Sequence, residues 1–435
     1  MRSHEEPART LAEGVRRREV LGWAMYDFAN SSYTTVVITA IFNAYFVGVV
    51  AAGAVWATFA WTATLAASYA LLMVFGPLVG AYADLRACKK KMLAFSTAGC
   101  VLATAALFFA GPQTLVPTIV LLALSNLFFG LGENLIAAFL PELGSAGGQG
   151  KLSGWGWSIG YVGGLITLGT CLAYITWASG QGHEAQQFVP VTMLITALFF
   201  ALASLPTFAW LRERALPQPA PSPRGLLHDS LSRLRHTLQH ARRYRDLRRF
   251  LICIVVYQAG VQTVIALAAI YAQQAMGFTT QDTILLIIVV NLTAAVGAFA
   301  FGYVQDRLGH VPTIALTLLG WIAMVVLAWF ARGPALFWIA ANLAGISLGA
   351  SQSAARAFVS VLSPRGRSAE FFGLWGLANR LASILGPLTY GAVTWISGGD
   401  HRLAMLITGG YFLAGLALLF SIDAARGRRA ALGSE

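Results

Sequence analysis

Ionisable and amide side chains interrupt the long apolar stretches of this chain at a few positions. Asp27 lies in the first stretch, Glu133 in the fourth and Arg356 in the tenth. A charged group at the centre of a membrane-spanning helix costs about 2.5–3.5 kcal/mol, so such groups usually line a wet cavity and pair with one another. A carboxylate placed there can carry a proton or bind a cation, and a guanidinium can bind an anion.

The polar side chains are unevenly distributed among the twelve apolar stretches. The first, fourth, seventh and tenth stretches hold eleven of them: Asp27, Asn30, Asn43, Asn126, Glu133, Asn134, Gln258, Gln262, Asn342, Gln352 and Arg356. The other eight stretches hold three, namely Asn291, Asn379 and Arg380. The third, sixth, ninth and twelfth stretches hold none, so we expect these to face lipid. The alternative for the polar set is structural hydrogen bonding between helices.

Within the polar set, helical spacing puts several side chains on shared faces. We predict a substrate and proton pathway made of Asp27, Asn30, Asn126, Glu133, Gln258, Gln262, Gln352, Arg356 and Arg380. Asp27 and Glu133 are the candidates for carrying a proton or binding a cation, and Arg356 is the candidate for binding an anion. Together these charges would suit a zwitterion, with its ammonium near the carboxylates.

Glu133 and Arg356 each lie eight residues before a proline (141 − 133 = 8; 364 − 356 = 8). This equal offset predicts that they lie at a similar depth, and we hypothesise that they approach each other when the cytoplasmic side closes. The alternative is that each bonds a neighbour in its own half, for example Arg356 with Gln352.

The elements that position these residues are membrane helices. The chain has 435 residues, of which 57% are hydrophobic and 11% are charged, whereas about 25% of residues are charged in soluble domains. We predict an all-α membrane protein with spans that start near residues 21, 58, 92, 115, 152, 188, 249, 282, 311, 335, 370 and 402. Each apolar run is close to the roughly 20 residues that a helix needs to cross a bilayer.

The net charge of +12 follows membrane topology and does not indicate nucleic-acid binding. With the N-terminus inside, 26 of the 30 Lys and Arg residues fall in cytoplasmic segments. Positive residues favour the cytoplasmic side of a membrane. We therefore expect both termini in the cytoplasm and a multi-pass protein of the bacterial inner membrane.

Two halves of the chain repeat one plan. Asp84 and Asp306 close similar Gly-containing segments and are 222 residues apart (306 − 84 = 222). Such repetition predicts two pseudo-symmetric six-helix halves, residues 1–211 and 250–435. A carboxylate at the end of a span can meet basic residues or a helix N-terminus, which would latch one conformation. The predicted gating residues are Gly80, Asp84, Lys89, Lys90, Gly302, Asp306, Arg307 and Gly309.

Residues 212–249 are predicted to form a cytoplasmic linker between the halves. Alternating prolines favour an extended start. Leu227, Leu231, Leu234 and Leu238 then recur at helical spacing among arginines. This pattern predicts an amphipathic helix on the anionic inner leaflet, and a regulatory or partner-binding helix is the alternative.

Three patterns suggest enzyme chemistry but lack its context. Gly156–Gly160 and Gly345–Gly349 match a nucleophile elbow, which requires a strand–turn–helix context that apolar helices do not supply. Gly156, Gly160 and Gly164 instead predict a small-residue face for helix packing. Residues 144–151 resemble a phosphate-binding loop but lack its required Gly and Ser or Thr. The four cysteines form no metal-ligand spacing, so we expect no enzyme, cofactor or metal site.

The chain resembles the major facilitator superfamily and, within it, the vacuole effluxer family of autophagy-linked amino-acid exporters. The resemblance rests on residues 23–31, 139–141, 153–164, 257–263, 352–356, 370–373 and 386–387, together with the loop motif at 302–309. In the first-half copy of that loop motif, Ala87 replaces a glycine. Ala137, Ala259, Ala355 and Ala357 also depart from the family pattern by removing polar side chains. The resemblance implies the twelve-helix major facilitator fold and transport.

We predict a secondary active transporter that works by alternating access, is proton-coupled and exports amino acids or similar zwitterionic metabolites. Another exporter of the same fold, for drugs or other metabolites, is the alternative, favoured by aromatic residues such as Trp23, Tyr26 and Trp157. A membrane-embedded enzyme or a non-transporting receptor is the alternative from a different class. The expected partners are a small-molecule substrate, a proton or other coupling ion and membrane lipids, with no nucleic acid, and we expect a monomer.

Overall fold

The computed structural model of the chain describes residues 10–52, 54, 56–145, 147–217, 244–278, 280–364, 366–398 and 400–433. The amphipathic helix predicted around Leu227–Leu238 lies outside these ranges. The division into residues 1–211, 212–249 and 250–435 therefore stays a prediction.

The described part of the chain folds almost entirely into helices, because only a helix satisfies the backbone polar groups of a single apolar segment in lipid. The first span is continuous but changes type: α1 (Arg17–Tyr33), the π-helical η1 (Thr34–Ala40), α2 (Phe42–Tyr45) and the π-helical η2 (Phe46–Val50). The other N-terminal helices are α3 (Ala57–Arg86), α4 (Lys89–Ala106), the short η3 (Leu107–Phe109), α5 (Leu115–Ala137), α6 (Leu140–Leu143), α7 (Gln149–Gly180) and α8 (Ala185–Trp210). The C-terminal helices are α10 (Arg245–Met276), α11 (Thr280–Leu308), α12 (His310–Phe330), α13 (Pro334–Leu362), α14 (Ser368–Ile396), α15 (His401–Leu419) and α16 (Ala424–Leu432).

The predicted spans are confirmed, because each predicted start lies within a few residues of the start of a long helix. Among the described residues, eleven helices are long and apolar enough to cross a membrane. The twelfth long helix, α14, is as long as the others, but Asn379 and Arg380 in its middle lower its hydropathy. The described part of the chain therefore contains the twelve long helices that the sequence predicts.

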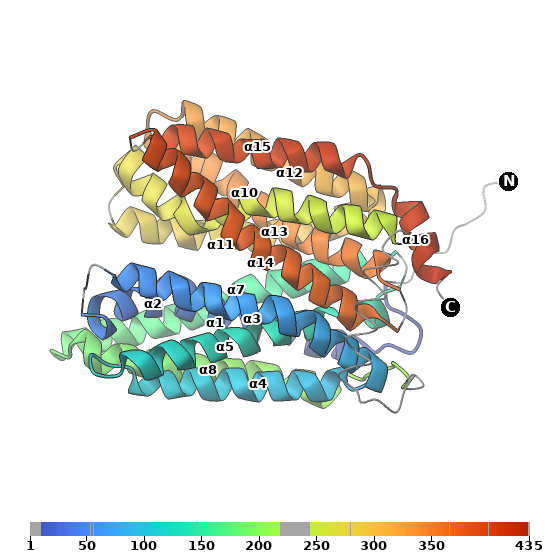
Figure 1. Cartoon of the computed structure of the whole chain (residues 1–435), viewed down its shortest axis with the longest axis horizontal. Helices are drawn as coiled ribbons and strands as arrows, with labels where there is room; N and C mark the ends of the chain where they lie inside the picture. Colours follow the sequence, from blue (N-terminus) through green and yellow to red (C-terminus); the bar gives the residue numbers. More distant parts are fainter. Residues whose placement is uncertain are drawn as a thin grey trace.

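The helices form a bundle with two groups that follow the order of the chain (Figure 1). The helices α4 and α8 lie along one edge of the bundle, and α12 and α15 lie along the opposite edge. Apolar side chains such as Leu102, Leu198, Leu319 and Leu413 are exposed on these four helices. These exposed apolar side chains fit the expectation that the third, sixth, ninth and twelfth spans face lipid, which stays a prediction.

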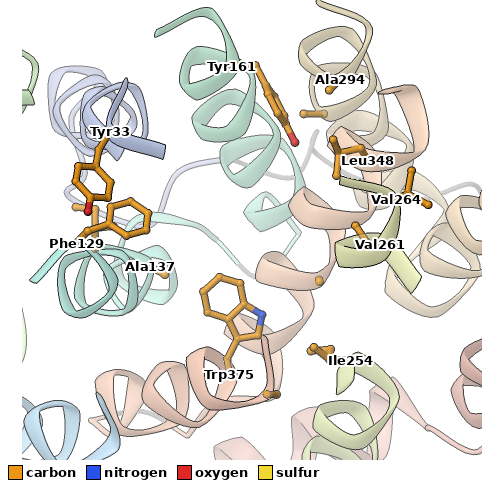
Figure 2. Close-up of a cluster of buried hydrophobic side chains, with 14 of the residues drawn as sticks. Tyr33, Phe129, Ala137, Tyr161, Ile254, Val261, Val264, Ala294, Leu348 and Trp375 are labelled. Atoms are coloured by element: carbon orange, nitrogen blue, oxygen red, sulfur yellow. The ribbon is translucent and has the colours of Figure 1, made fainter. Parts of the chain in front are cut away.

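Large aromatic side chains fill the interior of each group. Tyr33 stacks on Phe129 in the N-terminal group with ring centroids 4.9 Å apart, as Figure 2 shows. Trp321 stacks on Phe412 in the C-terminal group at 5.2 Å. Each six-helix group therefore has apolar packing of its own, and α3 with α14 and α7 with α11 make the main contacts between the groups.

One end of the bundle collects the turn between α3 and α4, the turn between α11 and α12, and helix α16 (Figure 1). Lys89, Lys90, Arg214 and Arg245 lie at this end, and we call it the basic end. Helix α10 begins here at Arg245, within the stretch predicted as linker.

Candidate functional site

Asp27 of α1 and Arg356 of α13 form an ion pair that joins the two predicted halves. Arg356 Nη1 donates to both carboxylate oxygens of Asp27, at 2.9 and 2.8 Å. Its Nε donates to Ser153 Oγ at 3.1 Å, and its Nη2 donates to the Ser153 carbonyl at 2.9 Å. Only 3% of the Arg356 side chain and 10% of the Asp27 side chain are exposed. All three guanidinium nitrogens are bonded, so we call this the sealed pair.

Aromatic rings and a glycine complete the surroundings of the sealed pair. The Arg356 guanidinium lies 4.7 Å from the ring centroid of Trp23 and 5.4 Å from that of Trp157. A Cβ atom at Gly156 of α7 would overlap the Asp27 carboxylate and Arg356 Nη2. Cation–π contacts and close backbone approach therefore both favour the observed position of the guanidinium.

Glu133 of α5 and Arg380 of α14 form a second ion pair between the halves. Arg380 Nη2 donates to Glu133 Oε2 at 2.7 Å, and the guanidinium lies 5.0 Å from the ring centroid of Tyr69. The exposed fractions are 14% for the Arg380 side chain and 29% for that of Glu133. Among the described residues, Arg380 Nε is buried with no hydrogen-bond partner. We call this the open pair.

The predicted amide residues lie near these pairs but bond in different ways. Gln258 Nε2 donates to Gln352 Oε1 at 2.8 Å, which links α10 to α13. Asn126 Nδ2 donates to Ser68 Oγ at 2.6 Å, which links α5 to α3. Within the described ranges, Asn30 Oδ1 is buried without a partner, and Gln262 is half-buried. The amides therefore bond within each predicted half.

At the basic end, two carboxylates cap helices of the opposite half. Asp84 Oδ2, at the end of α3, accepts from the Glu370 backbone N–H in the first turn of α14 at 2.9 Å. The Asp306 carboxylate, near the end of α11, accepts from the Gly150 and Lys151 backbone N–H groups in the first turn of α7, at 2.9 and 3.2 Å. Anions are stabilised at helix N-termini. The prediction that these aspartates meet a helix N-terminus is confirmed.

Two glycines allow the helices to approach at these carboxylates. A Cβ atom at Gly80 would overlap the Ala369 carbonyl, and one at Gly302 would lie 2.8 Å from the Gly150 carbonyl oxygen. Gly309, with φ of +89°, begins α12 from a conformation that side chains rarely adopt. Each predicted gating glycine is thus needed for its local geometry.

The basic residues of the predicted gating motif take other partners. Lys89 forms an ion pair with Glu142 and donates to Ser368 Oγ of the opposite half at 3.3 Å. Lys90 Nζ donates to the Leu211 carbonyl at 2.7 Å. Arg307 is exposed at the end of α11.

The predicted approach of Glu133 to Arg356 is wrong for this structure. The contacts of Asp84 and Asp306 join the predicted halves at the basic end, yet Arg356 pairs with Asp27 and Glu133 pairs with Arg380. The alternative bond from Arg356 to Gln352 is also absent from the described contacts, because Gln352 accepts from Gln258. Equal offsets from a proline indicate depth along a helix but not direction around its axis.

Three functional side chains were missed by the sequence reasoning. Ser153 accepts twice from Arg356, Tyr69 lies beside Arg380, and Glu142 pairs with the buried Lys89. Ser153 and Glu142 lie in or next to the motifs that carry the family resemblance, which was the available signal. Nothing in the sequence distinguishes Tyr69 from other aromatic residues in spans.

An apolar pocket of about 230 Å³ lies between α10 and α14 at the basic end. Its lining residues include Tyr244, Leu251, Phe371 and Leu374, with Arg248 as the charged member. None of the predicted pathway or gating residues lines it, so it is separate from the ion pairs.

Comparison with known sequences places the chain among membrane transporters. Residues 145–432 match the family model described as vacuole effluxer Atg22 like. The chain is 27% identical over 382 residues to YxiO of Bacillus subtilis, described as an uncharacterized MFS-type transporter, and the match covers 86% of this chain and 88% of that relative. It is 24% identical over 314 residues to autophagy-related protein 22-1 of Aspergillus niger, covering 65% of this chain and 48% of that protein. The chain thus spans about half the length of this fungal relative.

Solved structures share the fold. The human organic anion transporter MFSD10 matches with a TM-score of 0.68 and 16% identity, covering 92% of this chain and 98% of that one. A bacterial homologue of the iron transporter ferroportin, in its outward-facing state, matches with a TM-score of 0.69 and 14% identity, covering 93% and 98%. At these identities the likeness shows the major facilitator fold alone. With the family match over residues 145–432, the chain belongs to the Atg22-like vacuole effluxer family and is a multi-pass membrane transporter of the major facilitator superfamily.

Proposed function

We propose that this transporter works by alternating access, couples to the proton gradient and exports amino acids or similar zwitterionic metabolites. The observation that carries the proposal is that two buried or half-buried ion pairs join the predicted halves further into the bundle, while separate contacts join the halves at the basic end. An alternating-access carrier needs both features: a polar site between its halves and a gate that can open.

The gate would open by separating the carboxylates of Asp84 and Asp306 from the helix N-termini that they cap. Each contact contributes at most about 1–2 kcal/mol, as helix capping and dipole interactions do. Contacts of this size can hold one conformation and still be broken during a transport cycle. The basic end therefore serves as a reversible closure in this proposal.

Proton coupling would use the carboxylates of the two ion pairs. Protonation of Asp27 removes the charge that Arg356 needs, and a buried unpaired guanidinium is strongly unfavourable. Proton binding therefore favours separation of α1 from α13. Glu133 is more exposed than Asp27, so it exchanges protons with water more easily in this conformation.

An amino-acid substrate is preferred to an aromatic drug because the relevant rings are already engaged. Trp23 is fully buried and donates from Nε1 to the Ile136 carbonyl at 2.8 Å. The Tyr26 hydroxyl is hydrogen-bonded to Thr97 at 2.8 Å. The polar groups of both rings are thus bonded within the N-terminal helices, and the face of Trp23 is taken by Arg356 of α13.

The proposed orientation places the basic end in the cytoplasm of a bacterial cell, with the protein in its plasma membrane. Cysteine labelling in whole cells tests this. Cysteines introduced near residues 50, 112, 180 and 400 should react with an impermeant reagent from outside. Labelling of residues 212–217 from outside would contradict the orientation.

Transport is tested with the purified protein in liposomes that carry a pH gradient. Uptake of radiolabelled amino acids should depend on the gradient, and Asp27→Asn should abolish gradient-driven accumulation. Asp27→Glu, which keeps the carboxylate, should retain part of it. Unchanged accumulation in Asp27→Asn would remove Asp27 from coupling, and loss of folded protein in that variant would support a structural role instead.

A further inference from the structure

The two ion pairs leave very different hydrogen-bonding capacity on their arginines. Arg356 uses Nε, Nη1 and Nη2 on Asp27 and Ser153. Arg380 makes a single described hydrogen bond, from Nη2 to Glu133. A guanidinium has five N–H donors in a fixed planar fork. Arg380 is therefore the arginine between the halves that has donors to offer in this conformation.

The surroundings of Arg380 favour an incoming anion. Its Nε is buried with no partner among the described residues, and burying a donor without a partner is unfavourable. Asn134 of α5 is buried beside Glu133, and both polar atoms of its side-chain amide also lack described partners. A Cβ atom at Gly376 would overlap this amide, so Asn134 lies against α14 one turn before Arg380.

The Glu133 carboxylate makes fewer hydrogen bonds with its arginine, and is more exposed, than the Asp27 carboxylate that binds Arg356. It contacts Arg380 through one oxygen, and 29% of its side chain is exposed. The pair is half-buried and held by one hydrogen bond, so less interaction is lost when it exchanges partners than when the fully bonded Asp27–Arg356 pair is broken. A carboxylate that bound the guanidinium through two oxygens would form the stronger contact.

We infer that Arg380 binds the carboxylate of the substrate and that Glu133 occupies this position until substrate displaces it. This inference rests on the proposed transport of zwitterionic metabolites and names the group that recognises them. Because the Glu133–Arg380 contact joins α5 to α14, displacement also removes one link between the predicted halves. The sealed pair stays intact during this step.

The test compares amino acids with analogues that lack the carboxylate. The proteinogenic L-amino acids and their carboxamides are screened by thermal shift with the purified protein, and the hits are followed by flux in liposomes. The acids should stabilise the wild type and the carboxamides should not. Arg380→Gln should weaken binding of the acids about 10- to 100-fold, the usual range for losing a hydrogen bond to a charged group. Arg380→Lys should retain part of the affinity.

Glu133→Gln separates substrate binding from a merely structural bridge. Removing the competing carboxylate should tighten binding of the acids about 3- to 10-fold, the range expected when a ligand no longer has to displace one hydrogen-bonded competitor. A structural bridge would instead make Glu133→Gln and Arg380→Gln change affinity in the same direction. Arg332→Gln, an exposed arginine outside these contacts, is the matched control and should behave as wild type.

The possible failures are distinguishable. Normal affinity for the acids in Arg380→Gln, equal affinity for the carboxamides in the wild type, or weaker binding in Glu133→Gln would each overturn this inference while leaving transport of amino acids in place. A folded wild type that neither binds nor moves any member of the panel would overturn the proposed substrate class together with the inference.

Discussion

The contacts that join the two predicted halves fall into two layers that differ in symmetry. At the basic end the contacts repeat, because Asp84 caps α14 and Asp306 caps α7 in the same way. Further into the bundle they do not repeat. There the sealed pair of Asp27 and Arg356 is buried, with all three guanidinium nitrogens bonded, whereas the open pair is half-buried and singly bonded.

This difference follows from what each layer requires. A helix N-terminus offers the same backbone N–H groups whatever its sequence, so a duplicated carboxylate finds an equivalent partner in both halves. A buried ion pair depends on particular side chains that satisfy every donor and acceptor. The two pairs can therefore differ, and one can hold the halves together while the other exchanges partners.

Breaking the sealed pair should have the largest effect. Asp27→Asn and Arg356→Gln each leave the other member without its charged partner, and we expect each to lower the free energy of unfolding by about 3–5 kcal/mol. The double variant should lose clearly less than the sum of the two. Thermal and denaturant unfolding in detergent measures both quantities. Additive losses would show that Asp27 and Arg356 do not depend on each other.

Adding methyl groups to the glycines at the basic-end contacts should have the next largest effect. Gly80→Ala and Gly302→Ala place a methyl group against backbone of the opposite half and should disfavour the closed basic end by about 1–3 kcal/mol. Spin labels at the exposed positions 86 and 308 should then report longer distances. Gly169→Ala and Gly391→Ala, whose added methyl groups would meet nothing within 4 Å, are the matched controls. Unchanged distances in both variants would remove these glycines from closure.

The open pair should couple only weakly. The double-mutant cycle of Glu133→Gln with Arg380→Gln should give a coupling of about 1 kcal/mol in unfolding free energy, smaller than that of the sealed pair, because the pair is half-buried and held by one hydrogen bond. The crossed cycle of Glu133→Gln with Arg356→Gln should be additive. A large coupling in the crossed cycle would restore the pairing expected from the sequence and contradict the observed one.

Most of the fold could be predicted from the sequence because its signals are local. Apolar runs of bilayer length identified the spans, and the spacing of Asp84 and Asp306 identified the repeat. The π-helical turns η1 and η2 in the first span were not predicted. The η1 segment is itself rich in β-branched residues, whose preference is for strands rather than for this distortion.

The sequence predicted how deep the polar residues of the candidate site lie, but not which of them form pairs. Asp27 of the first span, Glu133 of the fourth and Arg356 of the tenth do contact the opposite half, yet their partners depend on how helices from distant parts of the chain rotate and approach. Gly156 shows why, because its missing side chain makes room for the Asp27 carboxylate and the Arg356 guanidinium. That role appears only when α1, α7 and α13 are placed together.

The smallest effect is expected at a position where the two equivalent turns of the basic end carry different residues. Ala87 and Gly309 occupy equivalent positions after the two latch carboxylates (87 − 84 = 3; 309 − 306 = 3), and both have positive φ, +49° and +89°. A left-handed conformation costs an L-residue about 1–2 kcal/mol, and replacing Ala87 with glycine removes this cost. Part of the resulting stabilisation is offset because glycine loses more entropy on folding. Ala87→Gly should therefore stabilise the protein by about 0.5 kcal/mol, whereas Gly309→Ala should destabilise it by a larger amount. Thermal unfolding of both variants in one detergent measures the difference, and a loss of stability in Ala87→Gly would show that the alanine methyl group contributes more than its backbone conformation costs.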